Sequence, residues 1–339
     1  MIIIPSMMFS GSIVMLLYFL LRPLLIKKCS VKSRHWLLMP AIVFYILPLQ
    51  VGKAFYIPRH YGMGGGYGGT GFDLSVNVIE RYPSGLTDFH ISPVNLILFV
   101  SILLGAALLF CGGMVLYDME KKHILQESRP LTDAIRIAEL ESIKGQLGIR
   151  KRVNYRISDT IKEPMTIGGF CPIYLLPSGQ FLPEESRYIV LHEMMHIKNE
   201  DAFMKGITFL AVCLNWYNPL VYYLMKEMNQ LSEIICDEAV VCSLGKSERI
   251  QYGNLILQMA CKGKTDTTVF AQAFTDHGKG MEERIRHILD ETKKKDSRVL
   301  TACLILLLSL STFFFTASIY QYPTVITIES IPEKSWQNR

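Results

Sequence analysis

Four long apolar runs constrain this chain more than any other feature of its sequence. They comprise residues 2–21, 36–52, 94–117 and 299–319. Each is close to the length that a helix needs to cross the roughly 30 Å hydrocarbon core of a bilayer at about 1.5 Å per residue. Only 19% of the residues are charged, against about 25% in soluble domains, and the mean hydropathy is +0.26. The composition disfavours a purely soluble protein, and we expect a multi-pass α-helical membrane protein.

Lysines and arginines orient the predicted spans. Residues 22–35 contain five of them and no acid, whereas three basic residues in the Gly-rich loop 53–93 are balanced by three acids. Cytoplasmic loops carry the excess of Lys and Arg, so the N-terminus and the loop 53–93 are expected outside. By the same reasoning, residues 118–298 form a cytoplasmic domain and residues 320–339 form a short external tail.

The net charge and the positions of the cysteines indicate which partners and which redox compartment to expect. The net charge of +5 comes largely from basic clusters beside the spans, where they meet the lipid bilayer and its anionic headgroups. Direct binding of nucleic acid is therefore not expected. All eight cysteines fall in predicted spans or cytoplasmic segments, and no C-x-x-C occurs. This distribution suits a reducing compartment and disfavours a disulfide framework.

The predicted cytoplasmic domain contains an H-E-x-x-H sequence at His192, Glu193 and His196, in a helix expected to begin at Pro183. Histidines four residues apart lie on one helical face and can share a tetrahedral zinc, while the intervening glutamate can reach the metal's water. A hydrogen-bonded histidine patch is the alternative, but the apolar neighbours imply burial, and buried imidazoles need partners. We predict that both histidines bind Zn²⁺ and that Glu193 is the general base and acid.

A separate helix is expected to supply the third ligand. Glu233 and Asp237 lie four residues apart in the otherwise apolar stretch 231–241. Two carboxylates in such a stretch are costly to bury without a compensating cation. We assign Glu233 to the metal and Asp237 to a hydrogen bond from a ligand histidine. The alternative is a pair of solvated acids on an exposed face.

A further apolar stretch, residues 207–225, lies between the two metal-binding segments. If it crossed the bilayer, His196 and Glu233 would emerge on opposite sides and could not share one ion. The sequence from Asn215 to Pro219 breaks the stretch near its middle. We therefore expect a buried or interfacial helical hairpin here.

Taken together, these motifs resemble the BlaR/MecR-type membrane metallopeptidases over about residues 1–320. The similar elements are H-E-x-x-H followed by Lys198 and Asp201, W-Y-N-P-L at Trp216–Leu220, E-x-x-C-D-E at Glu233–Glu238, P-x-T-x-G at Pro164–Gly168 and the basic helix Glu282–Leu289. The resemblance implies an α+β gluzincin domain inserted between the third and fourth spans of a bacterial plasma-membrane protein.

The resemblance also implies signal transduction in antibiotic resistance. Family members sense β-lactams outside, cleave themselves, and cause proteolytic loss of a winged-helix repressor of the BlaI/MecI type. The segment most compatible with self-cleavage lies near Ala273 and Phe274. By analogy with gluzincins, a strand over residues 172–176, with Ile173, Tyr174 and Leu175, is expected to be an edge to which an extended substrate adds.

One departure from the family affects the expected ligands. No S-x-x-K serine of a penicillin-binding domain follows the last predicted span, so we expect no covalent β-lactam binding. A homodimer is a further expectation. Two other functions stay open: a metallopeptidase that responds to envelope stress or peptide antibiotics, and a non-catalytic receptor or scaffold with structural zinc. Glu193 favours the enzyme, because a structural site needs no acid-base glutamate.

Overall fold

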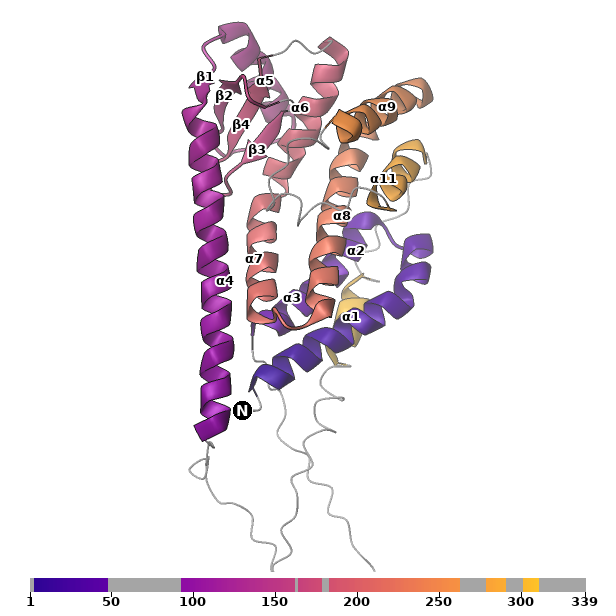
Figure 1. Cartoon of the computed structure of the whole chain (residues 1–339). Coiled ribbons are helices and arrows are strands. Elements are labelled where there is room, and N and C mark those ends of the chain that lie inside the picture. The colour runs from indigo at the N-terminus through magenta and orange to yellow at the C-terminus, as the bar shows by residue number, and fades with distance from the viewer. Residues whose placement is uncertain are drawn as a thin grey trace, which may run out of the picture.

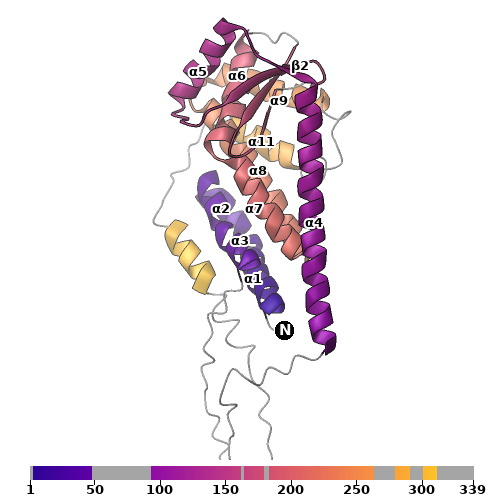
Figure 2. The same cartoon turned by 90° about the vertical axis from the view of Figure 1, so that its left-hand side faces the viewer.

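The computed structural model describes residues 3–47, 93–161, 164–178, 183–262, 279–290 and 301–310. Within these residues the chain is mostly helical and contains one four-stranded sheet. Two parts lie end to end: a unit with the sheet and the helices α5 and α6, and a bundle of helices beside the long α4 (Figures 1 and 2).

The helical bundle contains the most apolar helices. Those from the N-terminal third are α1 (Ile3–Lys28), α2 (Val31–Leu37), α3 (Met39–Ile46) and α4 (Pro93–Gln126). Two segments of them, Phe9–Lys28 and Val100–Gln126, are long and apolar enough to cross a membrane. Large apolar side chains of α4 are exposed, as expected of a surface that meets lipid; they include Ile97, Leu98, Leu103, Leu104, Leu108, Val115 and Leu116.

The second apolar run is not one continuous helix. Where the sequence predicted a single span over residues 36–52, α2 and α3 meet at Leu38. Pro40 lies in the first turn of α3, where its missing N–H costs no helical hydrogen bond. Of the run 299–319, residues Thr301–Leu310 are helical. The loop 53–92 and the tail 320–339 lie outside the described residues.

The helices α7 (Asp201–Leu214) and α8 (Pro219–Val241) form a hairpin beside α4, α3 and α1 (Figure 1). Its turn is fixed by asparagines. The side chain of Asn218 caps α8 by accepting a hydrogen bond from Leu220 N at 3.0 Å, and it donates one to Ser12 Oγ at 2.9 Å. Asn215 Nδ2 donates to the carbonyl of Tyr45 at 2.8 Å. The apolar stretch 207–225 therefore folds back on itself, and its tip is tied to α1 and α3.

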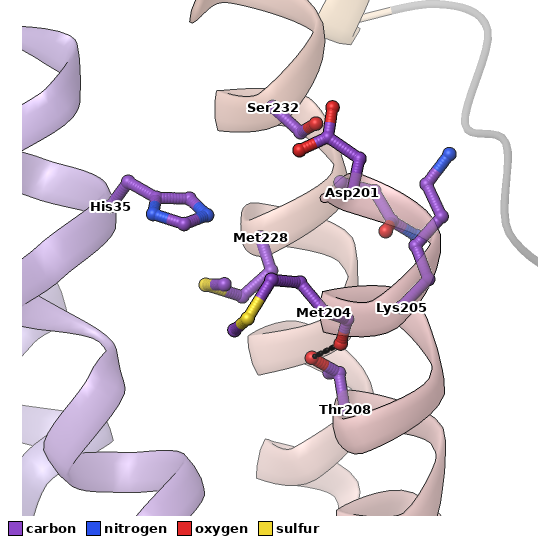
Figure 3. Close-up of a pocket in the computed structure, with 8 residues that line it drawn as sticks. His35, Asp201, Met204, Lys205, Thr208, Met228 and Ser232 are labelled. Carbon is purple, nitrogen blue, oxygen red and sulfur yellow. Dashed lines mark hydrogen bonds between the residues drawn. The ribbon is translucent and has the colours of Figure 1, made fainter. Parts of the chain in front are cut away.

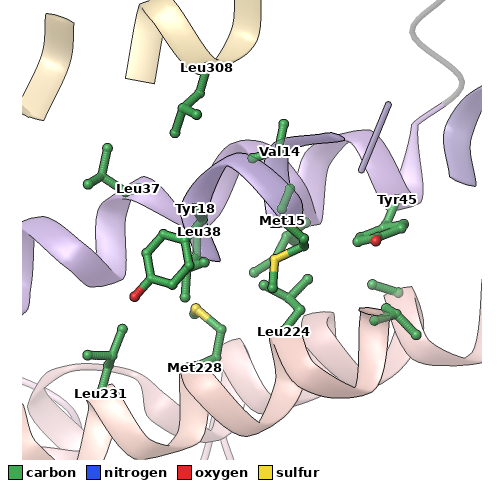
Figure 4. Packing of buried hydrophobic residues seen from close by; sticks show 14 of the residues in the cluster. Val14, Met15, Tyr18, Leu37, Leu38, Tyr45, Leu224, Met228, Leu231 and Leu308 are labelled. Carbon is green, nitrogen blue, oxygen red and sulfur yellow. The ribbon is translucent and has the colours of Figure 1, made fainter. Parts of the chain in front are cut away.

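The largest buried cluster joins this hairpin to α1, α2 and α3. Figure 4 shows Met15 and Tyr18 of α1 facing Leu224 and Met228 of α8, with Leu308 of the C-terminal helix on the far side of α1. All five side chains are buried. In lipid such packing stabilises the bundle through van der Waals contact, because the lipid tails are themselves apolar.

The other part, the sheet unit, is built around the sheet, with strand order β1-β2-β4-β3. The central pair is parallel and both outer pairs are antiparallel. The strands are β1 (Ser128–Pro130), β2 (Asn154–Ser158), β3 (Met165–Ile167) and β4 (Ile173–Pro177), and the helices are α5 (Ala134–Gln146), α6 (Pro183–Lys198), α9 (Lys246–Lys262) and α11 (Lys279–Leu289). A second apolar cluster packs α5 and α6 around the sheet.

The prediction that residues 172–176 form an edge of the sheet is wrong. Ile173, Tyr174 and Leu175 lie in β4, which pairs with β2 on one side and with β3 on the other. The open edge on the side of α6 is β3, which packs against that helix. A run as short as Met165–Ile167 carries little alternating pattern, so the sequence did not reveal the strand that covers β4.

Four charged residues form an ion-pair cluster where the bundle meets the sheet unit. Arg34 of α2 lies 3.1 Å from Glu227 and 3.0 Å from Glu283. Arg22 of α1 lies 3.2 Å and 3.3 Å from the same two residues, and Tyr18 donates to Glu227 at 2.8 Å. The Arg34 side chain is only 1% exposed. From the sequence we expect both arginines among the charges that meet lipid headgroups, yet each pairs with two carboxylates of the protein, and Arg34 is buried.

We predict that Arg34→Met destabilises the fold by about 3 kcal/mol or more, because it removes the more deeply buried of the two arginines that neutralise Glu227 and Glu283. The matched control is Lys122→Met, which breaks an exposed pair with Asp118 and should change stability by less than about 1 kcal/mol. Denaturant unfolding in detergent measures both. Equal shifts for the two variants would show that the cluster contributes nothing beyond a surface pair.

Candidate metal centre

The helix α6 brings the H-E-x-x-H residues together. Because His192 and His196 are one turn apart, their Nε2 atoms lie 3.2 Å from each other. A ligand atom of Glu193 joins them, and the three atoms lie within 4.8 Å of one another. The neighbouring apolar side chains Ile189 and Met194 are buried, which fixes the rotation of α6 and turns the histidines towards α8.

The third group comes from α8, which packs against α6. Glu233 Oε2 lies 3.5 Å from His192 Nε2, and Glu233 Oε1 lies 3.7 Å from His196 Nε2. The carboxylate therefore faces both Nε2 atoms, with one oxygen towards each ring. Two histidines and one carboxylate are a common ligand set of catalytic zinc sites, so we assign these three residues to the metal.

Each histidine directs its other ring nitrogen to a carboxylate. His192 Nδ1 lies 3.1 Å from Asp237 Oδ1, and His196 Nδ1 lies 2.5 Å from Asp201 Oδ2. Such contacts fix the tautomer and the ring orientation, so that Nε2 points to the metal. Asp237 lies where the sequence assigned it. From the sequence, Asp201 enters only as part of the family resemblance and without a role. Its position five residues after His196 is the feature that could have suggested one. The left-handed turn at Glu200, with a φ of 59°, precedes Asp201.

Two further residues of the site come from distant helices. The Tyr252 hydroxyl of α9 donates to Asp237 Oδ1 at 2.8 Å. The guanidinium of Arg284, from α11, donates to both Asp237 oxygens, at 2.8 and 3.0 Å, and lies 3.2 Å from Glu233. Sequence reasoning assigned neither a role. Part of the charge compensation that Glu233 and Asp237 need is supplied by Arg284, a group of the chain itself.

The charges of the site are set by these contacts. Burial lowers the pKa of His192, but its bonds to Asp237 and Glu233 outweigh burial and raise it to about 10. Against the effect of burial, Arg284 and His192 lower the pKa of Asp237 to about 2, and Arg284 holds that of Glu233 well below its usual range. Both carboxylates stay ionised at neutral pH, so the site attracts a cation, which displaces the proton of His192 when it binds.

His196, Asp201 and Cys236 form a second group of metal-ligating types. The Cys236 sulfur lies 3.4 Å from His196 Nδ1 and 3.7 Å from Asp201 Oδ2. This group would use the nitrogen that already bonds to Asp201. We therefore assign Asp201 and Cys236 to holding the ring of His196.

A small cavity lies behind this group, between α2 and the α7–α8 hairpin. Figure 3 shows Asp201 beside Ser232, with His35 of α2 across the cavity. The lining residues are His35, Asp201, Met204, Lys205, Thr208, Met228, Asn229 and Ser232. Its lining includes Asp201, which bonds to His196, but it includes neither the three assigned metal ligands nor Glu193.

Comparison with known proteins agrees with the resemblance in the motifs. The family model described as BlaR1 peptidase M56 matches residues 3–288. The chain is 27% identical over 224 residues to regulatory protein BlaR1 of Bacillus licheniformis, covering 63% of this chain and 37% of that protein. It is 28% identical over 143 residues to the methicillin resistance mecR1 protein of Staphylococcus aureus strain Mu50, covering 41% and 24%. The aligned part is thus less than two fifths of these relatives.

We predict one tightly bound zinc per chain. His196→Ala removes one of the three assigned ligands and should abolish stoichiometric zinc, whereas Glu193→Gln should retain it because we assign Glu193 to proton transfer. Elemental analysis of the purified proteins measures the metal content. Equal zinc in wild type and His196→Ala would rule out the assigned ligand set.

Asp201→Asn should weaken zinc binding about 10- to 100-fold, because His196 loses the carboxylate that orients its ring. Glu200→Gln is the matched control, since its exposed side chain pairs only with Lys151 among the described residues. Competition with a chromogenic chelator measures both affinities. An Asp201→Asn affinity equal to that of the control would remove Asp201 from the site.

Proposed function

Because the chain belongs to the BlaR1 peptidase M56 family, we propose that it is a multi-pass membrane zinc endopeptidase with a gluzincin-type catalytic domain. It acts as a signal-transducing antirepressor that cleaves itself and promotes the proteolytic inactivation of a BlaI/MecI-type repressor, which induces β-lactam resistance genes. The observation that carries the enzymatic part is the placement of Glu193 beside three convergent ligand side chains. The regulatory part rests on the names of the relatives.

The membrane topology is part of the proposal. The two helices able to span a membrane and the basic residues of 22–35 support an N-terminus outside and the sheet unit in the cytoplasm. In this orientation the ion-pair cluster of Arg22 and Arg34 lies at the cytoplasmic ends of the bundle. The sheet unit then faces cytoplasmic substrates such as a repressor.

The chemistry follows from the roles of four side chains. His192, His196 and Glu233 would hold the metal, as three protein ligands do in catalytic zinc sites. When bound, zinc would activate a water for attack and polarise the substrate carbonyl. Glu193 takes the proton of the attacking water and delivers it to the nitrogen of the leaving amine. Three ligands with an adjacent acid-base carboxylate favour a catalytic site over a structural one.

We propose that an extended substrate binds along β3. This strand has an open edge and packs against α6, the helix that carries Glu193. Main-chain hydrogen bonds to Met165–Ile167 would supply affinity that depends little on the substrate's sequence. We assign substrate binding to β3 and not to β4, because both sides of β4 are already paired.

Self-cleavage is proposed near Ala273 and Phe274, which lie outside the described residues. The helices on either side of them support this position. Tyr252 of the preceding α9 and Arg284 of the following α11 both bond to Asp237 of the metal centre. The chain therefore leaves and returns to the catalytic site on either side of the proposed cleavage site.

Glu193→Gln should reduce cleavage by about a hundredfold or more, because it removes the proton acceptor while keeping the size of the side chain and the three ligands. Mass spectrometry of the full chain in membrane vesicles detects a new terminus between residues 265 and 285. Glu238→Gln, a change in a half-exposed acid on α8, is the control and should cleave normally. If the same terminus appeared in zinc-loaded Glu193→Gln, the cut would belong to another protease.

A further inference from the structure

The helix α11 carries two adjacent charged residues that bond to different parts of the molecule. Arg284 bonds to the carboxylates of the metal centre, as described above. Glu283 bonds to the arginines of α1 and α2 in the bundle. Neighbouring residues of one helix move together, since the helical backbone holds them rigidly. A displacement of α11 at the Glu283 contact therefore also displaces Arg284, and the reverse holds.

Arg284 fixes the orientation of the Asp237 and Glu233 carboxylates in addition to neutralising their charge. Its planar guanidinium contacts Asp237 through two parallel hydrogen bonds and reaches Glu233 with its third nitrogen. A forked contact of this kind fixes direction as well as charge. Its side chain is only 14% exposed. One side chain thus sets the positions of a metal ligand and of the carboxylate that holds His192.

Glu283 is held equally firmly from the other side. Its carboxylate accepts from Arg34 Nη1 at 3.0 Å and from Arg22 Nη2 at 3.3 Å, and Gln230 of α8 donates to it as well. Arg34 is almost fully buried. Buried ion pairs are lost at high cost when one partner is withdrawn. The position of α11 is therefore tied to the positions of α1 and α2.

A second contact links α2 to the chain beyond α11. Ser33, next to Arg34, bonds through its hydroxyl to Thr301 Oγ1 at 2.8 Å. Thr301 begins the apolar helix that ends at Leu310. The two adjacent residues of α2 thus contact α11 and the apolar helix that follows it in the chain.

We propose that α11 couples the membrane helices to the metal centre. Arg284 is a positioning residue for Glu233 and Asp237, and the ion pairs of Glu283 determine where α11 holds it. A shift of α1 or α2 consequently moves Glu233 relative to the two histidines and changes the affinity of the site for its metal. The inference rests on the proposed zinc site, and it supplies a route by which an event in the membrane alters catalysis.

The decisive variant is Glu283→Gln in the full chain, because it loosens α11 while leaving the charge of Arg284 in place. We expect zinc affinity, measured by chelator competition, to fall about fivefold or more, and the visible spectrum of the Co²⁺-loaded protein to change. Glu282→Gln is the matched control on the same helix, since Glu282 forms an exposed pair with Arg286. If Glu283→Gln matched this control in affinity and spectrum, the proposal would be overturned.

A double-mutant cycle tests whether Glu283 acts through Arg284. In an Arg284→Gln background, Glu283→Gln should have no further effect on zinc affinity. An equal effect in both backgrounds would overturn the proposed route. Should Glu283→Gln fail to fold, Arg22→Gln removes one of the two ion pairs of Glu283 from the side of α1, where the arginine is 32% exposed, and must lower the zinc affinity relative to Glu282→Gln.

These measurements are independent of cleavage. A chain with the predicted zinc affinities that never cleaves would contradict the proposed peptidase and leave the coupling intact. A chain that cleaves, but whose zinc affinity is unaffected by Glu283→Gln, would contradict the coupling alone.

Discussion

The packing of α6 against α8 sets the geometry of the metal centre and the course of the chain between the two helices. It brings His192 and His196 from one helix to face Glu233 of the other. Ionised carboxylates are costly to bury, so this contact requires compensation. The histidines, Arg284 and Tyr252 provide it. The metal ligands and the helices α9 and α11 are therefore parts of one electrostatic arrangement.

The same contact limits how the chain between the two helices can run. Because α6 and α8 must meet, the apolar residues between them fold into the α7–α8 hairpin, with its tip bonded to α1 and α3. The ion pairs of Arg22 and Arg34 join the bundle to the sheet unit at its other end. The α7–α8 hairpin is therefore held at its tip by α1 and α3 and, nearer the metal centre, by the ion pairs of Glu227.

Local spacing predicted much of the site from the sequence, and distant contacts explain what it missed. His192 and His196, like Glu233 and Asp237, are four residues apart on their own helices, so the periodicity of the helix revealed each pair. Arg284 lies 47 residues after Asp237, and no periodicity connects them. The three-residue β3 was too short to predict, so β4 was taken for the edge. The turn at Asn215–Pro219 was readable because asparagine and proline have local conformational preferences.

We propose that a catalytic metal is held by two histidines and one carboxylate, with a position open to water. X-ray absorption spectroscopy at the zinc edge of the zinc-loaded chain distinguishes this ligand set from the alternatives. We expect two imidazole nitrogens and two oxygens at about 2.0–2.2 Å, and no sulfur. A sulfur neighbour at about 2.3 Å would place Cys236 in the coordination sphere, and, like a site closed by four protein ligands, it would contradict the catalytic assignment.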